Sequence, residues 1–307
     1  MGCIVVTGAA GFLGQQIAEA FCNSGEQVVA VDRNLPKGDL PSLGESRTTD
    51  VRSRAFGDIL AATGCDMIVH AAAPASVPLS FADPEADFTE AVGTFYHLLE
   101  TVRRVRPACR VVLVSSAAVY GNPSELPISE DAPLRPISPY GYHKLLCEEV
   151  GAQYRRLFDI RVCFARVFSA YGPGLRRQLL WDICEKAHGS SEVRLWGTGR
   201  ETRDLLHARD VASGIVAIAR GSAFDAEAYN LASGEEASIH NVATRVLAQL
   251  PERRALSFSG EGRRGDPSRW RADISRIRQL GFVPTVGLDE GLKDYVEWAL
   301  RCLQWVR

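Results

Sequence analysis

A glycine-rich turn near the start of the chain constrains its fold more than any other feature. Residues 4–14 read IVVTGAAGFLG, so a short apolar run leads into a turn that contains Gly8, Gly11 and Gly14. In such a turn the first glycine permits the tight bend and the second lets a pyrophosphate approach the backbone. The third lets the following helix pack closely on the strand. Because an acidic residue, Asp32, also ends the next apolar run, the pattern predicts a dinucleotide-binding βαβ unit.

Apolar runs and helical patterns alternate through the first half of the chain. Runs rich in valine or isoleucine, without polar alternation, predict strands covered on both faces. They occupy residues 3–6, 27–31, 67–69, 110–114 and 161–165. Helical patterns lie between them at 12–23, 84–104 and 142–158. This alternation predicts right-handed βαβ units in an α/β fold with a doubly wound parallel sheet.

The pattern changes after Tyr171-Gly172-Pro173-Gly174. Helical stretches are then mixed with short strands, at 178–187, 193–195, 211–219, 228–231 and 289–303. We therefore expect a Rossmann domain over residues 1–168 and a smaller C-terminal α/β substrate lobe over residues 169–307. This boundary is approximate, because later segments of the chain are free to return to the Rossmann domain.

Composition narrows the classes of partner. The 307 residues carry a formal net charge of only -2, which argues against nucleic acid as a partner. No apolar stretch is long enough to span a bilayer, so no membrane association is expected. The eight cysteines include no C-x-x-C pair, which predicts no metal site and favours reduced thiols in a cytoplasmic protein.

The acidic residue after the second strand indicates which dinucleotide binds. A carboxylate at Asp32 accepts hydrogen bonds from the adenosine ribose and repels a 2′-phosphate, so NAD is favoured over NADP. The adjacent Arg33 is capable of holding that phosphate, but a solvated side chain is the preferred interpretation. Asp50 and Val51 follow a further expected strand, for which the sequence gives no bounds, and there they would meet the adenine.

Seven segments together resemble the extended short-chain dehydrogenase/reductases, and among them the NAD-dependent nucleotide-sugar epimerases and dehydratases. They are TGAAGFLG (7–14), HAAAPASV (70–77), VSSAAVYG (114–121), SPYGYHK (138–144), RVFSAYGPG (166–174), RDLLHARDVA (203–212) and RRGDPSRWRAD (263–273). The resemblance implies cofactor contacts at Gly8, Gly11, Phe12, Leu13, Gly14, Asp32, Arg33, Asp50, Val51, Ala71, Ala72, Ala73, Tyr140, Lys144 and Phe168.

The same resemblance implies a catalytic group of Ser116, Tyr140 and Lys144. Tyrosine alone is a poor base at neutral pH, but Lys144 stands four residues after Tyr140, on the same helical face. A lysine cation and an oxidised nicotinamide both favour the phenolate, which takes a hydroxyl proton while hydride leaves the same carbon. Ser116 would hydrogen-bond the reacting oxygen.

The two residues that directly follow the serine distinguish the reactions that members of this family catalyse. The 4,6-dehydratases typically carry Asp-Glu there, whereas this chain has Ala117 and Ala118. Dehydration by the usual route is therefore disfavoured. What remains is plain hydride chemistry: epimerisation, or net oxidation or reduction.

The resemblance also implies residues that contact the substrate, and most of them lie after the Rossmann segment. Arginine suits a diphosphate because its planar fork makes paired, charge-assisted bonds, although a surface salt bridge is an alternative for each arginine. Trp196 either packs near the base or fills the lobe. The expected set is Ser116, Ser169, Arg176, Trp196, Arg203 and Arg263.

Two residues depart from the family pattern. Glu90 replaces the asparagine of an Asn-Val-x-Gly-Thr segment, and Ser169 replaces the asparagine before Tyr-Gly-Pro. Because the second asparagine commonly touches the substrate, Ser169 leaves the sugar open, and the two changes together leave room for an altered reaction.

The sequence thus supports one main hypothesis and two alternatives. The main one is an NAD-dependent nucleotide-sugar epimerase that acts at C4 through a transient keto sugar. The alternatives are an oxidoreductase with net turnover of NAD(P)H, and a dinucleotide sensor without catalysis. The resemblance also implies a homodimer that pairs the helices at 84–104 and 142–158.

Overall fold

A seven-stranded parallel sheet forms the centre of the molecule. The computed structural model describes residues 2–35 and 44–304. The strand order is β11-β6-β5-β4-β1-β2-β3, and every neighbouring pair is parallel. The order reverses between β1 and β4, and ligands bind at the carboxyl ends of the strands at such a point. The strands are β1 (Cys3–Thr7), β2 (Gln27–Asp32), β3 (Glu45–Thr48), β4 (Met67–His70), β5 (Arg110–Ser116), β6 (Val162–Val167) and β11 (Asp225–Leu231).

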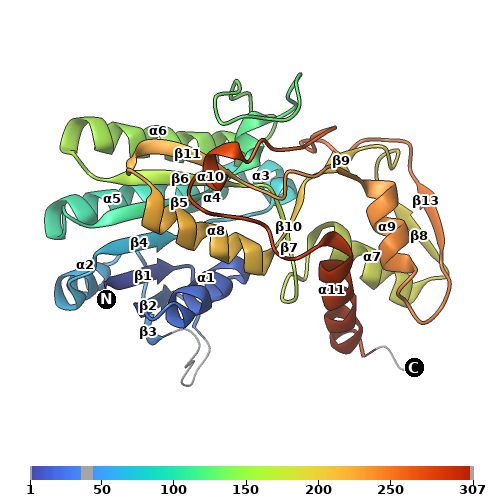
Figure 1. Ribbon diagram of the computed structural model, residues 1–307, viewed down its shortest axis with the longest axis horizontal. Helices are drawn as coiled ribbons and strands as arrows, with labels where there is room; N and C mark the ends of the chain where they lie inside the picture. Colours follow the sequence, from blue (N-terminus) through green and yellow to red (C-terminus); the bar gives the residue numbers. More distant parts are fainter. Residues whose placement is uncertain (1, 36–43, 305–307) are drawn as a thin grey trace.

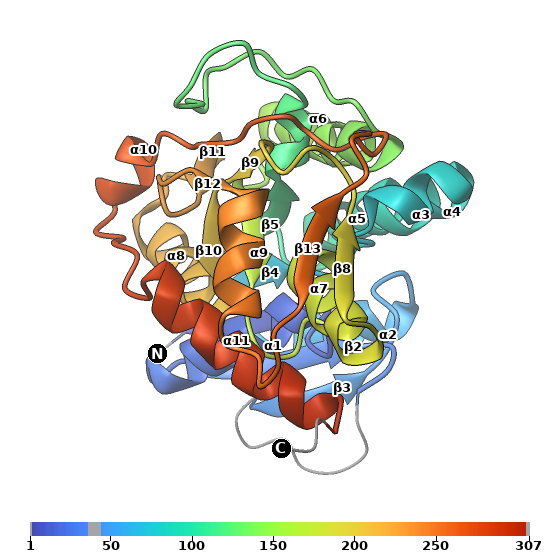
Figure 2. The same cartoon turned by 90° about the vertical axis from the view of Figure 1, so that its right-hand side faces the viewer.

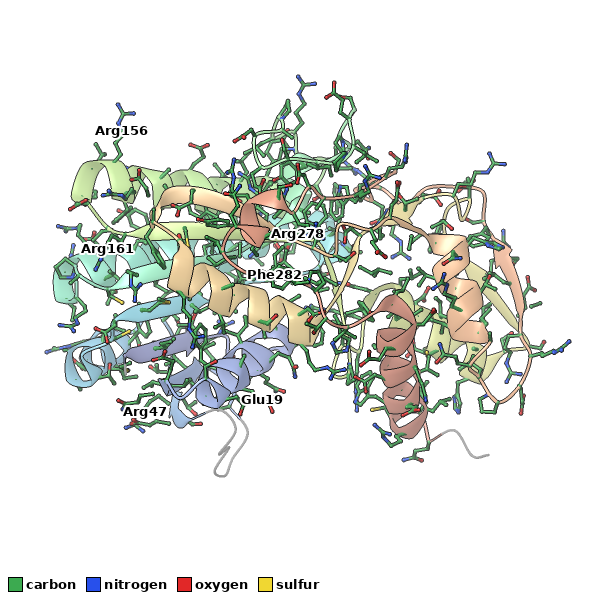
Figure 3. All side chains as sticks on the ribbon, in the orientation of Figure 1. Glu19, Arg47, Arg156, Arg161, Arg278 and Phe282 are labelled. Carbon is green, nitrogen blue, oxygen red and sulfur yellow. The ribbon has the colours of Figure 1, made fainter. Side chains whose placement is uncertain are left out.

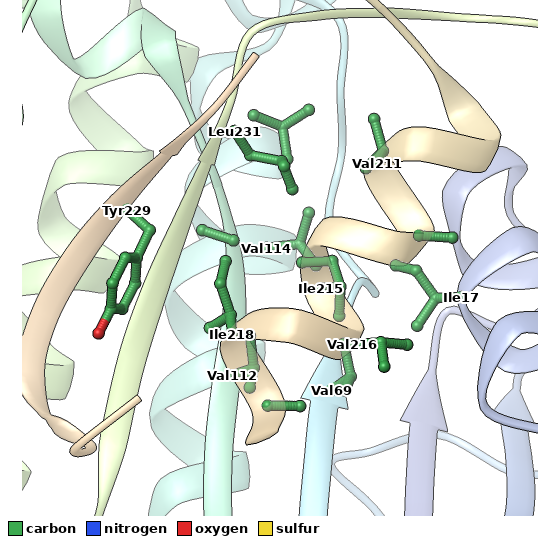
Figure 4. Close-up of a cluster of buried hydrophobic side chains, with 14 of the residues drawn as sticks. Ile17, Val69, Val112, Val114, Val211, Ile215, Val216, Ile218, Tyr229 and Leu231 are labelled. Atoms are coloured by element: carbon green, nitrogen blue, oxygen red, sulfur yellow. The ribbon is translucent and has the colours of Figure 1, made fainter. Parts of the chain in front are cut away.

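Helices cover both faces of the sheet (Figure 1). One face packs against α1 (Phe12–Asn23) and α8 (Ala208–Gly221), and the other against α2 (Arg54–Thr63), α5 (Thr94–Val105) and α6 (Pro139–Phe158). In Figure 4, Ile215 and Ile218 of α8 lie against valines of β5. These side chains are fully buried, so removing their apolar area from water stabilises the layer.

A π-helical turn interrupts the helical segment between β4 and β5. The structure resolves this region into α3 (Val77–Ala82), α4 (Pro84–Phe88), the π-helical η2 (Thr89–Gly93) and α5. The predicted continuous helix over 84–104 is therefore corrected to two α-helices joined by one wider turn. Such π-turns occur often at functional sites.

A smaller lobe sits beside the carboxyl ends of the central strands (Figures 1 and 2). Its core joins α7 (Gln178–Gly189), α9 (Ile239–Leu247) and α11 (Leu288–Cys302) to the parallel pair β8 (Glu192–Leu195) and β13 (Ala255–Phe258). Two small pairs connect it to the sheet domain. They are β7 (Ser169–Tyr171) with β10 (Leu205–His207), and β9 (Thr202–Arg203) with β12 (Ala237–Ser238).

Two elements expected in the smaller lobe belong to the sheet domain instead. The helix predicted at 211–219 is α8, which packs on α1, and the strand predicted at 228–231 is β11, which pairs with β6 at the sheet edge. The reason is burial, since α8 supplies nine buried residues to the sheet face. The chain therefore crosses back into the first domain, and a division at residue 168 does not describe these two elements.

Figure 3 shows Arg156 pointing outward near the end of α6, whereas Phe282 lies inward near α8. Phe282 belongs to the core between the sheet and the short helix α10 (Ser275–Arg278). Among the described residues, no helix is both long and apolar enough to cross a membrane.

Candidate active site

The glycine turn is shaped by contacts that leave no room for side chains. Gly8 has a φ of +74°, and a Cβ there would lie 2.6 Å from the backbone of Ala71 and Ala72. A Cβ on Gly14 would lie only 2.0 Å from the Gly8 carbonyl oxygen. Helix α1 begins after Gly11, which provides no side-chain cap, so its first N–H groups stay available to an anion. The turn therefore fits a pyrophosphate.

A pocket of about 310 Å³ opens beside this turn. Its lining includes the turn, the ends of β2 and β4, and η2; of the predicted cofactor residues it contains Gly8, Gly11, Asp32, Arg33, Asp50, Val51, Ala71, Ala72 and Ala73. Thr94 also lines it, and the buried Thr94 Oγ1 has no hydrogen-bond partner among the described residues. Because a buried hydroxyl rarely stays unpaired, this atom points to a polar ligand. The residues fit a dinucleotide.

Asp32 is oriented by the backbone at the mouth of this pocket. Its carboxylate accepts hydrogen bonds from the N–H groups of Ala10 (3.1 Å) and Asn34 (3.0 Å). This holds an acid at the end of β2, where the adenosine ribose binds in Rossmann folds. Arg33, expected to be solvated, has a side chain that is 52% exposed, and it also pairs with Glu90 at 2.9 Å.

The proposed catalytic residues meet at the carboxyl end of β5. Ser116 is the last residue of β5, and its Oγ accepts a hydrogen bond from the Ala118 N–H at 3.1 Å. Tyr140 and Lys144 lie in the first turns of α6, and the Lys144 ammonium is 5.9 Å from the centroid of the Tyr140 ring. Lys144 is buried and donates to the Val114 carbonyl at 3.0 Å, which fixes its head group.

The start of α6 is held by three local contacts. Ser138 caps the helix by accepting from the Gly141 N–H, and Pro139 occupies the first helical position. The Tyr140 N–H donates to the Ser80 hydroxyl of α3 at 3.1 Å. A Cβ on Gly141 would lie 2.6 Å from the Ala118 carbonyl oxygen, so the helix packs directly on the segment after Ser116.

A buried ion pair anchors the same helix from behind. Glu148, one turn after Lys144, pairs with Arg166 of β6 at 2.7 Å, and both are about 5% exposed. Glu148 also accepts from the Ser115 hydroxyl at 2.6 Å, and Arg166 donates to the Tyr120 hydroxyl. Since β5 and β6 carry the partners, this network fixes α6 relative to the end of the sheet.

Three of the residues predicted to bind substrate come together around one acid. Burial raises the pKa of Asp266, and the cations Arg203 and Arg263 oppose that rise. The Arg263 guanidinium lies 5.7 Å from the centre of the exposed Trp196 ring, and Arg203 donates to the Pro267 carbonyl. Two cations and an aromatic surface are thus gathered at one side of the lobe.

The loop that carries Arg263 and Asp266 passes over the start of the helix that bears Tyr140. A Cβ on Gly265 would lie 2.7 Å from Phe81 of α3 and 3.3 Å from Ser138 at the start of α6. The Arg264 guanidinium stacks 4.3 Å from the centroid of the Phe81 ring. The small lobe and the helix that bears Tyr140 are therefore in direct contact.

Other predicted residues are placed differently. Arg176 lies against the rings of Trp181 and Trp298 and donates to Cys302 Sγ, so its contacts are with α7 and α11 of the lobe. Phe168 packs in the core, with its ring centroid 5.7 Å from that of Trp270.

The last three predicted residues are Phe12 and Leu13, which follow the glycine turn, and Ser169, which follows β6. Phe12 packs against the small-lobe core and Leu13 against the sheet core. Ser169 follows β6 and is half-buried, and its N–H donates to the Asp204 carbonyl beside Arg203.

Sequence reasoning missed several residues of the pocket. Thr94 and Arg52 line it, yet neither was singled out. Arg52 follows Asp50 by two positions, which was an available signal. Thr94 ends the segment Glu-Ala-Val-Gly-Thr, in which Glu90 departs from the family pattern, and its place in that segment was an available signal.

Comparison with known proteins shows the family to which the chain belongs. Residues 4–232 match the model of the "NAD dependent epimerase/dehydratase family". The UDP-glucose 4-epimerase of Mycolicibacterium smegmatis is 31% identical over 96% of this chain and 97% of its own length. A crystal structure of UDP-glucuronic acid 4-epimerase from Bacillus cereus, in complex with UDP-glucuronic acid and NAD, has a TM-score of 0.89 at 26% identity and covers 98% of this chain and 99% of its own.

A third relative performs a different reaction. The structure of an NAD-dependent NDP-hexosamine 5,6-dehydratase involved in tunicamycin biosynthesis has a TM-score of 0.86 at 30% identity, covering 97% of both chains. Similarity alone therefore does not separate epimerases from dehydratases, and the residues of the site must do so. The chain belongs to the NAD-dependent epimerase/dehydratase family.

Proposed function

We propose that this protein is an NAD-dependent nucleotide-sugar epimerase that inverts C4 of the sugar. The observation that carries the proposal is the set of groups around the reacting position. Tyr140 and a buried Lys144 stand beside Ser116, while Ala117 and Ala118 offer no second acid or base. These groups suffice to remove and return one proton at one carbinol oxygen.

Each residue has a defined part in the reaction. The Tyr140 phenolate takes the proton of the 4-hydroxyl, and the Lys144 ammonium stabilises the negative oxygen before that transfer. Ser116 donates a hydrogen bond to the same sugar oxygen as it becomes a carbonyl. NAD, which the residues lining the pocket beside the glycine turn would hold, would supply the acceptor for the C4 hydride and its donor on return. After the keto sugar turns over, Tyr140 returns the proton, so no net oxidation occurs.

The residues after Ser116 argue against elimination. Loss of water needs a base to remove a proton from carbon and an acid to protonate the leaving hydroxyl. Ala117 and Ala118 form the buried start of the 3₁₀ turn η3 (Ala117–Tyr120) and carry neither group. The dehydratase reaction of one relative is therefore not proposed for this chain.

A nucleoside diphosphate sugar is the proposed substrate. Arg203 and Arg263 would bind the diphosphate, with the indole of Trp196 available to the base and Ser169 to the sugar. Because the named epimerase relatives act on UDP-glucose and UDP-glucuronic acid, those two are the first substrates to test. Arg176 reaches the diphosphate only if its side chain leaves the two tryptophans.

We propose a homodimer in the cytoplasm. Exposed apolar side chains lie on α5 and α6, including Tyr96, Tyr142 and Leu146, and such a surface is typical of a helix-pairing interface. The cytoplasm is supported by the eight cysteines, all of which are free thiols. Light scattering at micromolar concentration tests the dimer, and a Tyr142→Glu/Leu146→Glu variant is expected to be monomeric.

The function is tested by product analysis without added cofactor. Purified protein is incubated with UDP-glucose or UDP-glucuronic acid, and products are followed by proton NMR while absorbance reports NADH. We expect the C4 epimer to form to equilibrium without accumulation of NADH. NADH in proportion to product would instead identify a net oxidoreductase, and a dehydrated or decarboxylated product would overturn the assignment.

A further inference from the structure

Four charged side chains from three separate segments surround the mouth of the cofactor pocket. Arg33 follows β2, Asp50 and Arg52 follow β3, and Glu90 lies in the π-helical turn η2. All four line the same pocket as Asp32. Because Asp32 marks the position of the adenosine ribose, this cluster faces the 2′-position of a bound dinucleotide.

Glu90 holds both arginines of the cluster. Its carboxylate lies 2.9 Å from the Arg33 guanidinium and 3.1 Å from that of Arg52. Asp50 pairs with Arg52 at 2.9 Å and lies 3.8 Å from Arg33. Each guanidinium is thus already committed to carboxylates before any ligand arrives.

The net charge at the mouth of the cofactor pocket disfavours the binding of a 2′-phosphate. Two guanidinium groups face the three carboxylates of Asp32, Asp50 and Glu90, which leaves one net negative charge. A 2′-phosphate brings up to about two further negative charges. To bind it, the arginines would have to exchange Glu90 for the phosphate, and the displaced carboxylate would remain beside the new anion.

The position of Glu90 depends on the π-helical turn. The turn widens the helix between α4 and α5, and Val92 and Ala91 of the same turn are buried. Glu90 is therefore on the half-buried side of a locally fixed segment rather than on a free loop. An asparagine, the residue expected from the family pattern, would carry no charge to offer either arginine.

From these contacts we propose that Glu90 is a cofactor-selectivity residue, which neutralises Arg33 and Arg52 and so excludes NADP from the pocket. Without Glu90, the two guanidinium groups would form a fork that binds a 2′-phosphate by charge-assisted hydrogen bonds. Asp32 repels that phosphate, and Glu90 withholds the cations that would attract it. The inference rests on the cofactor site assigned above.

The test compares the dinucleotides that the protein holds. Wild-type protein and the variants Glu90→Asn and Glu90→Gln are equilibrated with equal concentrations of NAD⁺ and NADP⁺, freed of unbound ligand and denatured. Mass spectrometry then gives the ratio of released NADP to NAD. We expect the ratio to rise about tenfold or more in both Glu90 variants, and the gain to shrink as ionic strength increases.

Matched variants separate this effect from a general loss of negative charge. Glu85→Gln removes an exposed carboxylate from neighbouring α4 and is expected to leave the ratio unchanged. Adding Arg33→Ala to Glu90→Asn removes one of the released cations and is expected to reverse most of the gain.

Failure of the inference and failure of the cofactor site give different results. An unchanged ratio in both Glu90 variants, with NAD still bound, would overturn the role of Glu90. An Asp32→Ala variant is expected to raise the ratio independently. If wild-type protein holds neither dinucleotide, or Asp32→Ala changes nothing, the assigned cofactor site itself is wrong.

Discussion

The molecule contains two charge clusters that differ in their exposure to water. Behind the catalytic helix, Glu148 and Arg166 are about 5% exposed and share hydrogen bonds with two neighbouring hydroxyls. At the pocket mouth, the side chains of Arg33 and Glu90 are 52% and 31% exposed. Coulomb interactions are strong in a dry interior, where an unpaired charge is strongly destabilising, but they are weak in water. The buried cluster should therefore control stability and alignment, and the exposed cluster the choice of ligand.

The largest effect is expected from breaking the buried pair. Glu148→Gln leaves the Arg166 guanidinium without its counter-charge, so the free energy of unfolding should fall by about 3–5 kcal/mol. Denaturant titration measures this loss, and Glu149→Gln, an exposed acid on the same helix, serves as control. A double variant that replaces Glu148 and Arg166 by methionine should recover part of it. If Glu148→Gln lowered the free energy of unfolding by less than about 1 kcal/mol, the expected difference between the buried and the exposed cluster would be contradicted.

At the proposed reacting position, a change should affect rate and leave stability intact. Tyr140→Phe removes only the acid–base hydroxyl, so kcat is expected to fall by about 10²–10⁴-fold. The denaturation midpoint should stay unchanged because, among the described residues, Tyr140 makes a hydrogen bond through its backbone N–H and none through that hydroxyl. If the variant retained wild-type kcat with NAD bound, Tyr140 would not be the base.

The interior near the site also makes stability depend on pH. Burial, followed by the nearby Lys144 cation, lowers the pKa of His70 to about 3. The unfolded chain therefore binds a proton at this histidine below pH ~6.5 while the folded chain does not, and folding stability is lost as pH falls through that window.

This loss should amount to about 1.4 kcal/mol for each pH unit between about 6.5 and 3. His70→Gln should flatten the dependence of unfolding free energy on pH in that range, whereas the exposed His240→Gln should leave it unaltered. A wild-type slope in the His70 variant would mean that other groups cause the acid sensitivity.

The smallest effect on stability is expected at the exposed cluster. Glu90→Asn should change the free energy of unfolding by less than about 1 kcal/mol, because water and salt screen its two ion pairs. The same denaturant titration used for Glu148 gives a direct comparison. A loss as large as that of Glu148→Gln would show that exposure does not separate the two clusters.

Much of the fold could be predicted from sequence because local chemistry determined it. The buried valine-rich strands, the glycine turn and the Tyr140–Lys144 spacing each depend on neighbours within a few residues. The polar edge strand β3, with the sequence ESRT, gave no such signal, so its bounds could not be assigned. The return of β11 to the sheet also could not be predicted, because a strand sequence does not state which edge it joins.

Like the fold, the site could be predicted from the sequence only in part. Asp32 and Ser116 are the last residues of β2 and β5, so the strand pattern was enough to place them at the carboxyl edge of the sheet. The pairing of Arg33 with Glu90 joins residues far apart in the chain and depends on a π-helical turn that no periodicity indicated. Arg176 matched a motif, but packing against two tryptophans decided where its side chain lies.

The most direct test of the account follows the hydrogen on C4. The UDP-sugar that the enzyme converts is prepared with deuterium at C4 and incubated in ordinary water without added NAD. If hydride leaves C4 and returns to the same carbon, the epimer must retain the deuterium. Loss of deuterium to water, or its appearance in free NADH, would contradict epimerisation at C4.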